Sequence, residues 1–161
     1  MLRPLLTLIF VAALPALAAA APAAPGFKVT PLDGKTIDSR ELIGKKVIVL
    51  RFQASYCKPC AKESAAFGRV VERYRDRDVV FIAVHVQDTV TDVRRFMKVN
   101  NVTYPVGVDP KLNLGNRYGF KGSPYTVIID RKGEIAYKLA GEGAPGRLPK
   151  LLEPLLKPTT S

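Results

Sequence analysis

One stretch of sequence, residues 47–74, constrains the fold of this chain more than any other. Its first seven residues, Val47–Gln53, are almost continuously apolar and β-branched, a pattern typical of a strand that is covered on both faces. A short polar link leads to Cys57-Lys58-Pro59-Cys60, and the following residues have the apolar spacing of an amphipathic helix that runs to Tyr74. The sequence therefore predicts a buried strand that delivers two cysteines to the N-terminus of a helix.

The position of the two cysteines suits thiol chemistry. A thiolate at a helix N-terminus meets unpaired backbone N–H groups and the positive end of the helix dipole, so its pKa falls and its reactivity near neutral pH rises. We expect Cys57 to be the exposed, attacking thiol and Cys60, one turn further in, to be the resolving thiol. Pro59 fits the first helical turn because its missing N–H would have no partner there. No separate cofactor is expected, because a Cys57–Cys60 disulfide carries the electrons itself.

A purely structural role for the cysteines is the first alternative. A bridge that closes a loop of about four residues constrains the unfolded chain by only roughly 2 kcal/mol. A structural zinc site usually needs four ligands, and the chain has two cysteines and one histidine. Redox chemistry is therefore the stronger interpretation, and no metal site is expected.

The residues around the cysteines resemble a known family. The segment Phe52–Cys60, FQASYCKPC, is similar to the F-W-A-x-W-C-x-P-C motif of the thioredoxin family. Cys60-Ala61-Lys62-Glu63 is similar to the C-x-x-E continuation of the exported, TlpA-like branch, which includes the thioredoxins of cytochrome c maturation. The resemblance extends to Gly122-Ser123-Pro124 and covers most of residues 27–157. It implies a thiol:disulfide oxidoreductase.

The resemblance also implies how a partner is held. Pro124 directly precedes a strongly β-forming run, and in the family the matching proline is cis and faces the two cysteines. Ser123 beside it should offer its backbone to an extended partner strand. Tyr56 is expected to form an aromatic wall beside Cys57. Lys58 is expected to lower the thiolate pKa further, although an exposed lysine often contributes little. Together with Pro59, these are the expected substrate-binding residues.

Three positions depart from the family pattern or tune the thiols. Glu63, three residues after Cys60, is the candidate for a base that takes the proton of Cys60 or for an electrostatic tuner, with a solvated first-turn acid as the alternative. Six residues before Cys57, where the family has an aspartate or a neutral polar group, stands Arg51, which cannot act as a base. We expect Arg51 to pair with Glu63 beneath Cys60, or to reach solvent along its aliphatic stem. Gln53 replaces a tryptophan and is expected to make the approach to the thiols more polar.

Two other classes of function remain as alternatives. His85 lies in a strand pattern and is expected to be a satisfied or edge-exposed histidine. Two thiolates and an imidazole could instead form the copper site of an assembly factor with the same fold, although those proteins use a wider cysteine spacing. A non-catalytic adaptor that binds peptides is the other alternative. A peroxidase is disfavoured, because no proline-threonine-cysteine arrangement precedes Cys57.

The N-terminus predicts export. Arg3, the apolar run Leu5–Leu17 and the alanines that follow have the pattern of a secretory signal, which we expect to be cleaved near Ala20. The alternative is an uncleaved segment that anchors the protein to the inner membrane. Export to the periplasm would place the cysteine pair where disulfides form and persist. The expected organisation is a signal peptide at 1–20, a flexible lead at 21–26, one thioredoxin-like domain at 27–157 and a tail at 158–161.

The charge and the resemblance together limit the partners. A net charge of +11 favours anionic surfaces and acidic partners. The basic residues are dispersed without aromatic interleaving, so no nucleic acid is expected. The resemblance implies disulfide-bearing exported proteins as substrates, apocytochrome c among them, and a membrane thiol protein as electron donor. A monomer is expected. The helix N-terminus favours an oxidant, whereas the resemblance favours a reductant, which is our expectation.

Along the rest of the chain, strands alternate with helices and end in a hairpin. This pattern predicts an α/β thioredoxin-like fold with a mixed central sheet, helices on both faces, an N-terminal hairpin and one extra helix–strand insertion before Pro124. The expected elements are a hairpin of 27–30 with 36–37, a helical turn capped at 38 or 39 and ended by Gly44, a strand at 79–86, a helix from 89 or 91 to 98, a strand at 104–108, a helix at 111–118, strands at 124–130 and 134–139, and a helix at 148–156.

Overall fold

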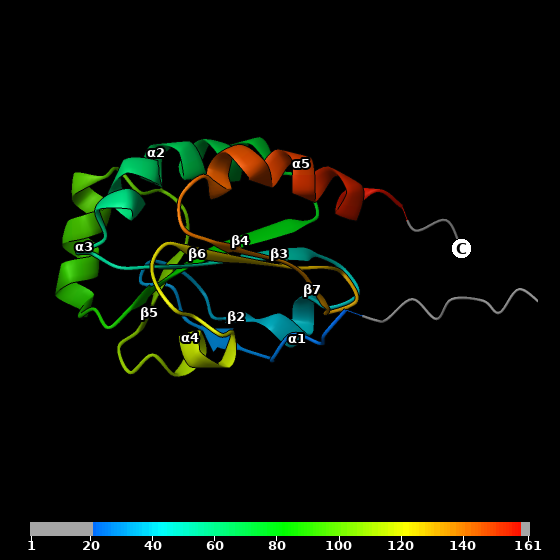
Figure 1. Ribbon diagram of the computed structural model, residues 1–161, viewed down its shortest axis with the longest axis horizontal. Coiled ribbons are helices and arrows are strands. Elements are labelled where there is room, and N and C mark those ends of the chain that lie inside the picture. Colours follow the sequence, from blue (N-terminus) through cyan, green and yellow to red (C-terminus); the bar gives the residue numbers. More distant parts are fainter. Residues whose placement is uncertain (1–20, 159–161) are drawn as a thin grey trace, which may run out of the picture.

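The computed structural model describes residues 21–158, and a mixed five-stranded sheet lies at its centre. The strand order is β5-β4-β3-β6-β7 (Figure 1). The three strands β3, β4 and β5 are parallel, β6 is antiparallel to β3, and β7 is antiparallel to β6. The bounds are Val47–Gln53 for β3, Val79–Val86 for β4, Val106–Asp109 for β5, Tyr125–Ile129 for β6 and Ile135–Ala140 for β7. The expected signal segment 1–20 and residues 159–161 lie outside the described residues.

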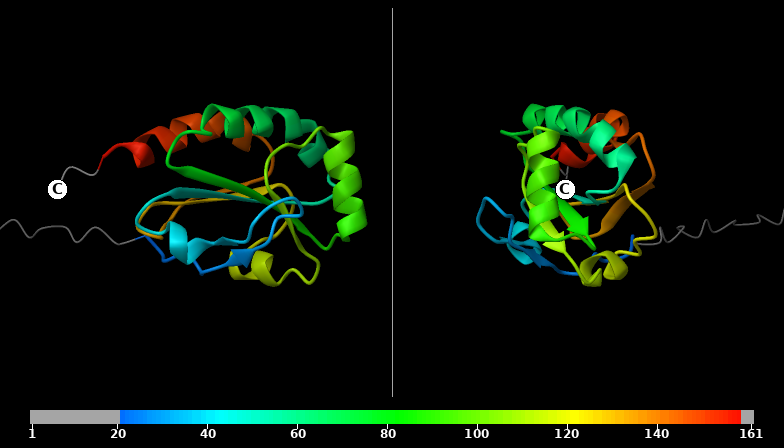
Figure 2. Two further views of the ribbon diagram at one scale, coloured as in Figure 1. Left: turned by 180° about the vertical axis from the view of Figure 1, so that it is seen from behind. Right: turned by 90° about the vertical axis from the view of Figure 1, so that its left-hand side faces the viewer.

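Helices cover both faces of this sheet, as expected for the fold class. The long helices α2 (Lys58–Arg73) and α5 (Ala144–Leu156) lie on one face, and α3 (Val90–Val99) stands at one end (Figures 1 and 2). The opposite face carries the hairpin of β1 (Lys28–Val29) and β2 (Ile37–Asp38) with the short helices α1 (Ser39–Leu42) and α4 (Asn113–Arg117). Within residues 21–158, no helix combines the length and the apolar content that a membrane crossing requires.

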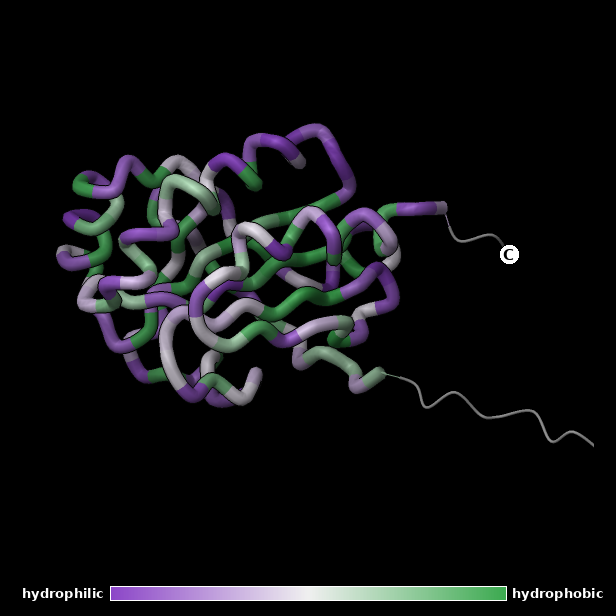
Figure 3. Tube along the Cα trace, turned by 45° about the horizontal axis from the view of Figure 1, so that its top comes forward, coloured by the Kyte–Doolittle hydropathy of each residue, from purple (hydrophilic) through white to green (hydrophobic). Residues whose placement is uncertain are grey.

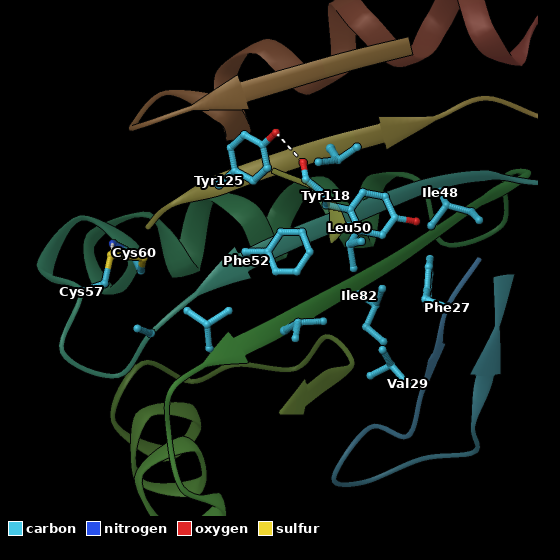
Figure 4. Close-up of a cluster of buried hydrophobic side chains, with 14 of the residues drawn as sticks. Phe27, Val29, Ile48, Leu50, Phe52, Cys57, Cys60, Ile82, Tyr118 and Tyr125 are labelled. Atoms are coloured by element: carbon cyan, nitrogen blue, oxygen red, sulfur yellow. Dashed lines mark hydrogen bonds between the residues drawn. A yellow bond between two sulfur atoms is a disulfide. The ribbon is translucent and has the colours of Figure 1, made fainter. Parts of the chain in front are cut away.

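Strand β3 is central because both of its faces are buried. All seven of its residues are buried, and alternate residues join two different apolar clusters. Val47 and Val49 pack with α2 and α5, while Ile48, Leu50 and Phe52 pack with the hairpin and α4 (Figure 4). Burying one such side chain contributes about 1.5–3 kcal/mol. The hydropathy colouring in Figure 3 follows this arrangement, with apolar strands inside and polar turns outside. The position of β3 therefore fixes where the cysteine pair leaves the sheet.

Most element boundaries follow the sequence prediction, and the exceptions have local causes. Strands β3 and β4 match it, and Thr89 caps α3 by accepting a hydrogen bond from the Asp92 N–H at 3.2 Å. Helix α5 begins at residue 144 instead of 148, because Gly143 takes a φ of 91° and Pro145 fits the first turn. Helix α4 is shorter than expected, since Leu112 is left-handed at its start. Smaller shifts move β5 to 106–109, β7 to 135–140 and the start of β6 to residue 125.

Gly107 in β5 is required by a close approach between the sheet and the hairpin. A Cβ atom at this position would lie 2.2 Å from Cγ1 of Val29, a buried and β-branched residue that cannot turn away. We expect Gly107→Ala to lower the free energy of unfolding by about 1–3 kcal/mol, as overpacked cores do. Urea unfolding measures the change. Gly146→Ala is the matched control, because nothing lies within 4 Å of its added Cβ, and a similar loss there would contradict the explanation.

Candidate active site

Cys57 and Cys60 form a disulfide at the start of α2. Cys57 is the N-cap residue, and its Sγ accepts a hydrogen bond from the backbone N–H of Cys60 at 3.2 Å. Pro59 lies in the first turn of the helix, as predicted. Because this N–H and the helix dipole both point at Sγ, negative charge on Cys57 is stabilised when the bridge opens.

The expectation that Cys57 is exposed is wrong in this oxidised form. Cys57 is 7% exposed and Cys60 is fully buried, because the bridge packs against the apolar cluster that contains Phe52 and Ala54 (Figure 4). Cys57 nevertheless lines an open groove of about 540 Å³, whereas Cys60 does not. The groove is lined by Tyr56, Cys57, Lys58, Pro59, Gln87, Phe120, Lys121, Gly122 and Ser123. A partner disulfide in this groove therefore meets Cys57 first.

The other wall of the groove ends at a cis proline. The Ser123–Pro124 peptide bond is cis, as the resemblance implied, and Ser123 lines the same groove as Cys57. The hydroxyl of Ser123 has no hydrogen-bond partner among the described residues. Tyr56 is 66% exposed and forms the expected aromatic wall. Four of the five expected substrate-binding residues, Tyr56, Lys58, Pro59 and Ser123, thus border one groove, and the fifth, Pro124, directly follows Ser123 in the sequence.

The predicted pair of Arg51 and Glu63 is formed. Nη2 of Arg51 lies 2.8 Å from Oε2 of Glu63, and the exposed fractions of the two side chains are 1% and 12%. The guanidinium also lies over the ring of Phe67, 5.0 Å from its centroid, and donates to Oγ1 of Thr126 at 3.4 Å. The alternative that Arg51 reaches solvent is therefore wrong. Glu63 is not a freely solvated acid either, since Oε1 also accepts the backbone N–H of Gly143.

Gln53 differs from its expectation, and its surroundings include residues that the sequence did not single out. Its side chain is fully buried and points toward the α2 side of the sheet, so it does not make the thiol approach more polar. Oε1 of Gln53 accepts a hydrogen bond from Nε of Arg51 at 3.3 Å, and Nε2 lies 2.8 Å from Nε2 of His85. Nδ1 of His85 lies 2.7 Å from a carboxylate oxygen of Asp88. The same carboxylate accepts the N–H and the hydroxyl of Ser55.

Period-two alternation places Arg51 and Gln53 on one face of β3, so their contact could have been predicted. No signal pointed to Asp88 or Ser55, because their contact depends on two loops at neighbouring strand ends.

His85 is a satisfied buried histidine, as the default interpretation expected. Its burial lowers the pKa below the ordinary value of 6.5, and Asp88 opposes this shift in part. Both ring nitrogens are engaged by Gln53 and Asp88, and neither faces the cysteines. Across the described part of the chain, no three His, Cys, Asp or Glu side chains cluster in a way that could hold a metal ion. The geometry therefore gives the copper alternative no support.

The burial of His85 predicts an acid-sensitive stability. The unfolded chain takes up a proton on this residue near pH 6.5, whereas the folded chain binds it more weakly because the pKa is lowered. The free energy of unfolding should therefore fall as the pH drops below about 6.5, by at most about 1.4 kcal/mol per pH unit for one proton. Urea unfolding between pH 7.5 and pH 5 measures it. The chain has one histidine, so the change is specific, and a flat profile would contradict the prediction.

Comparisons with known proteins identify the family of this chain. The model of the AhpC/TSA family matches residues 21–138. The chain belongs to this family. It is a thioredoxin-like thiol–disulfide oxidoreductase, consistent with the TlpA-like branch that the C-x-x-C and C-x-x-E motifs indicated.

Among its relatives is a thiol-disulfide oxidoreductase ResA of Bacillus cereus. It is 32% identical over 130 residues, which are 81% of this chain and 75% of ResA. The structure of StoA from Bacillus subtilis is 25% identical with a TM-score of 0.71 and covers 81% of this chain and 99% of its own. A thiol:disulfide interchange protein of the thioredoxin family from Chlorobium tepidum TLS has a TM-score of 0.76 at 24% identity. The match covers 87% of this chain and 99% of that structure, and it supports the fold. The fold class predicted from the sequence is confirmed.

Proposed function

We propose that this oxidoreductase reduces disulfides of exported proteins, with Cys57 as the attacking thiol and Cys60 as the resolving thiol. The observation that carries the proposal is the difference in accessibility between the two cysteines. Cys57 lines the groove, Cys60 is fully buried, and Glu63 follows Cys60 on the same helix, held by Arg51. A partner disulfide can therefore meet only Cys57, and Cys60 must be activated from inside the protein.

The reduction then runs in two displacements. The Cys57 thiolate attacks one sulfur of the partner disulfide, which forms a mixed disulfide and releases the other partner sulfur as a thiolate. The Cys60 thiol gives its proton to the Glu63 carboxylate, and its thiolate attacks Sγ of Cys57. This step closes the Cys57–Cys60 bridge and releases the second partner thiolate, while Glu63 returns the proton to a partner thiolate or to water. Two electrons have moved from the cysteine pair to the partner.

The charges at the cysteine pair and the likeness to relatives both bear on the direction of electron flow. The helix N-terminus stabilises a thiolate and thereby the reduced form, which favours an oxidant. The charge of Glu63 is balanced by the Arg51 guanidinium 2.8 Å away, so the pair adds no net negative charge near Cys60. The ion pair with Arg51 fixes Glu63 in this place. The likeness to the TlpA-like branch supports the reductant.

The midpoint potential of the Cys57–Cys60 couple tests the direction. Residues 21–161 are equilibrated in glutathione or dithiothreitol buffers, and the reduced fraction is counted by alkylation. A potential near the roughly −270 mV of thioredoxin is expected, and one near the roughly −120 mV of DsbA would overturn the reductant assignment. Either result leaves thiol–disulfide exchange itself intact.

The proposal includes a location and partners. Residues 1–20 are proposed as a cleaved signal that sends the protein to the periplasm, where it acts as a monomer without nucleic acid. Its substrates would be disulfide-bearing exported proteins, apocytochrome c among them, and a membrane thiol protein would return it to the dithiol form. Cell fractionation with N-terminal sequencing tests the location. Recovery of the full-length chain in the membrane fraction would favour the anchored alternative.

A further inference from the structure

The hydrogen bonds around Arg51 continue as a buried chain across two strands. From Arg51 the chain passes through Gln53 and His85 to Asp88 and ends on Ser55. Gln53 and His85 are directly opposite each other in the parallel pairing of β3 and β4. The four buried members, Arg51, Gln53, His85 and Asp88, are each at most 5% exposed. The thiol chemistry described so far uses only the Arg51 end of this chain.

The direction of every hydrogen bond in the chain follows from Arg51. A guanidinium only donates, so the amide oxygen of Gln53 must face it and the amide NH₂ must face His85. Nε2 of His85 is then an acceptor and carries no proton, which places the proton on Nδ1, where it is donated to Asp88. The carboxylate accepts from both groups of Ser55 at 2.6 Å. The structure therefore holds His85 as the neutral Nδ1–H form.

The residues at the two ends of this hydrogen-bond chain flank the disulfide in the sequence. Ser55 stands two residues before Cys57, and Glu63, on the far side of Arg51, stands three residues after Cys60. We propose that His85 is a positioning residue for thiol–disulfide exchange, because its neutral form holds the Ser55 turn ahead of Cys57 and the Arg51–Glu63 pair behind Cys60 in one arrangement. The proposal rests on exchange at this pair and is independent of the direction of electron flow.

Protonation of His85 is incompatible with this arrangement. A proton on Nε2 would face the NH₂ group of Gln53, so two donors would oppose each other in a buried site. The groups that face the ring are Gln53 from β3, Asp88 from the loop after β4 and the ring of Phe96 from α3 at 4.8 Å. Asp88 is the one charged group among them and would retain an imidazolium through Nδ1. The hydrogen bond between Gln53 and His85 would therefore break first, and Gln53 would no longer be held in place against Arg51.

Two substitutions of His85 each keep one of its two hydrogen bonds and remove the other. The amide of an asparagine can take the place of Nδ1–H, so His85→Asn keeps the bond to Asp88 and loses the bond to Gln53. A glutamine can take the place of Nε2, so His85→Gln keeps Gln53 and loses Asp88. Neither variant titrates. Thr126→Val is the matched control, because it removes another buried hydrogen bond of Arg51 and leaves His85 unchanged.

The experiment measures the rate at which the reduced proteins react with 4,4′-dithiodipyridine from pH 4.5 to pH 8. In the wild type and in Thr126→Val, we expect the pH profile of the rate to show a second inflection below pH 6.5, besides the one caused by ionisation of the thiol. The rate should change by about threefold to tenfold across this inflection, the factor that corresponds to one hydrogen bond. Both His85 variants should lack it. A wild type without the inflection, or His85 variants that keep it, would overturn the proposal. Variants that lose thermal stability but keep the wild-type pH profile would also overturn it, because His85 would then be structural.

A measurement on the unsubstituted protein covers the case in which the variants do not fold. In ¹⁵N NMR spectra of the reduced protein, the Ser55 backbone amide and the Gln53 side-chain amide should titrate together with the His85 ring. Signals that stay constant while His85 titrates would overturn the proposal. A wild type that reacts with the reagent but cannot reduce any protein disulfide would count against the proposed function and leave this inference intact.

Discussion

Replacing Cys57 with serine is expected to abolish disulfide reduction, with a rate loss of about three orders of magnitude or more. Cys57 lines the groove, and Cys60 is fully buried and cannot take over the attack. Serine keeps the size and the N-cap role, but its hydroxyl is not a nucleophile at neutral pH without a base. The measurement is the dithiothreitol-driven reduction of insulin by the wild type and the variant, with both confirmed to be folded.

Cys60→Ser is the matched control. This variant keeps the attacking thiol and loses the resolving one, so a partner should stay attached to Cys57 as a mixed disulfide that dithiothreitol releases. Incubation with oxidised apocytochrome c, followed by non-reducing electrophoresis, tests the proposed substrate at the same time. Full function of Cys57→Ser in cells would contradict the account and favour the peptide-binding adaptor.

Replacing Glu63 with alanine is expected to lower the free energy of unfolding by about 3–5 kcal/mol. The substitution leaves the Arg51 guanidinium, which is 1% exposed, without a counter-ion in the interior. The neutral contacts with Gln53, Thr126 and the ring of Phe67 do not replace the lost charge. Urea unfolding at pH 7 measures the loss. Arg51→Met should have a smaller effect, because Glu63 is 12% exposed and can regain water.

Two further variants test whether the loss comes from the unpaired charge. The double variant Arg51→Met with Glu63→Ala should recover much of the stability, because no charge stays buried. Glu72→Ala on the same helix removes an acid whose partner Arg75 is exposed, so it should change stability by about 0–1 kcal/mol. Additive losses in the double variant would show that the two residues do not act as a pair.

Much of the fold could be predicted because the local patterns agree with the tertiary structure. The apolar runs of β3 and β4 are buried on both faces, so their sequences show both type and extent. Helix α5 was harder, because Pro145, Pro149 and Pro154 indicate breaks in a local pattern. The helix nevertheless includes all three, with Leu148 and Leu152 fully buried against the sheet face. Packing across the sheet outweighed the local preference there.

The candidate site likewise has features that the sequence predicts and one that it does not. The cysteine pair and its place at a helix start follow from residues close in sequence, where spacing decides which side chains meet. Arginine in a buried strand also requires a counter-ion, so the pattern predicts its partner. The burial of Cys57 could not be predicted, because the apolar cluster that the bridge joins includes Tyr118 and Tyr125, which are distant in sequence.

By itself, the sequence determined the redox chemistry of this protein, since a thiol pair at a helix N-terminus is a local arrangement that short-range geometry enforces. Only the tertiary structure decided how that pair is supported. Gln53 changed from a groove residue to a buried link, and His85 acquired two partners, because the parallel pairing of β3 with β4 aligns two side chains that lie 32 residues apart. Register between strands depends on the whole folded sheet, and no local pattern carries it.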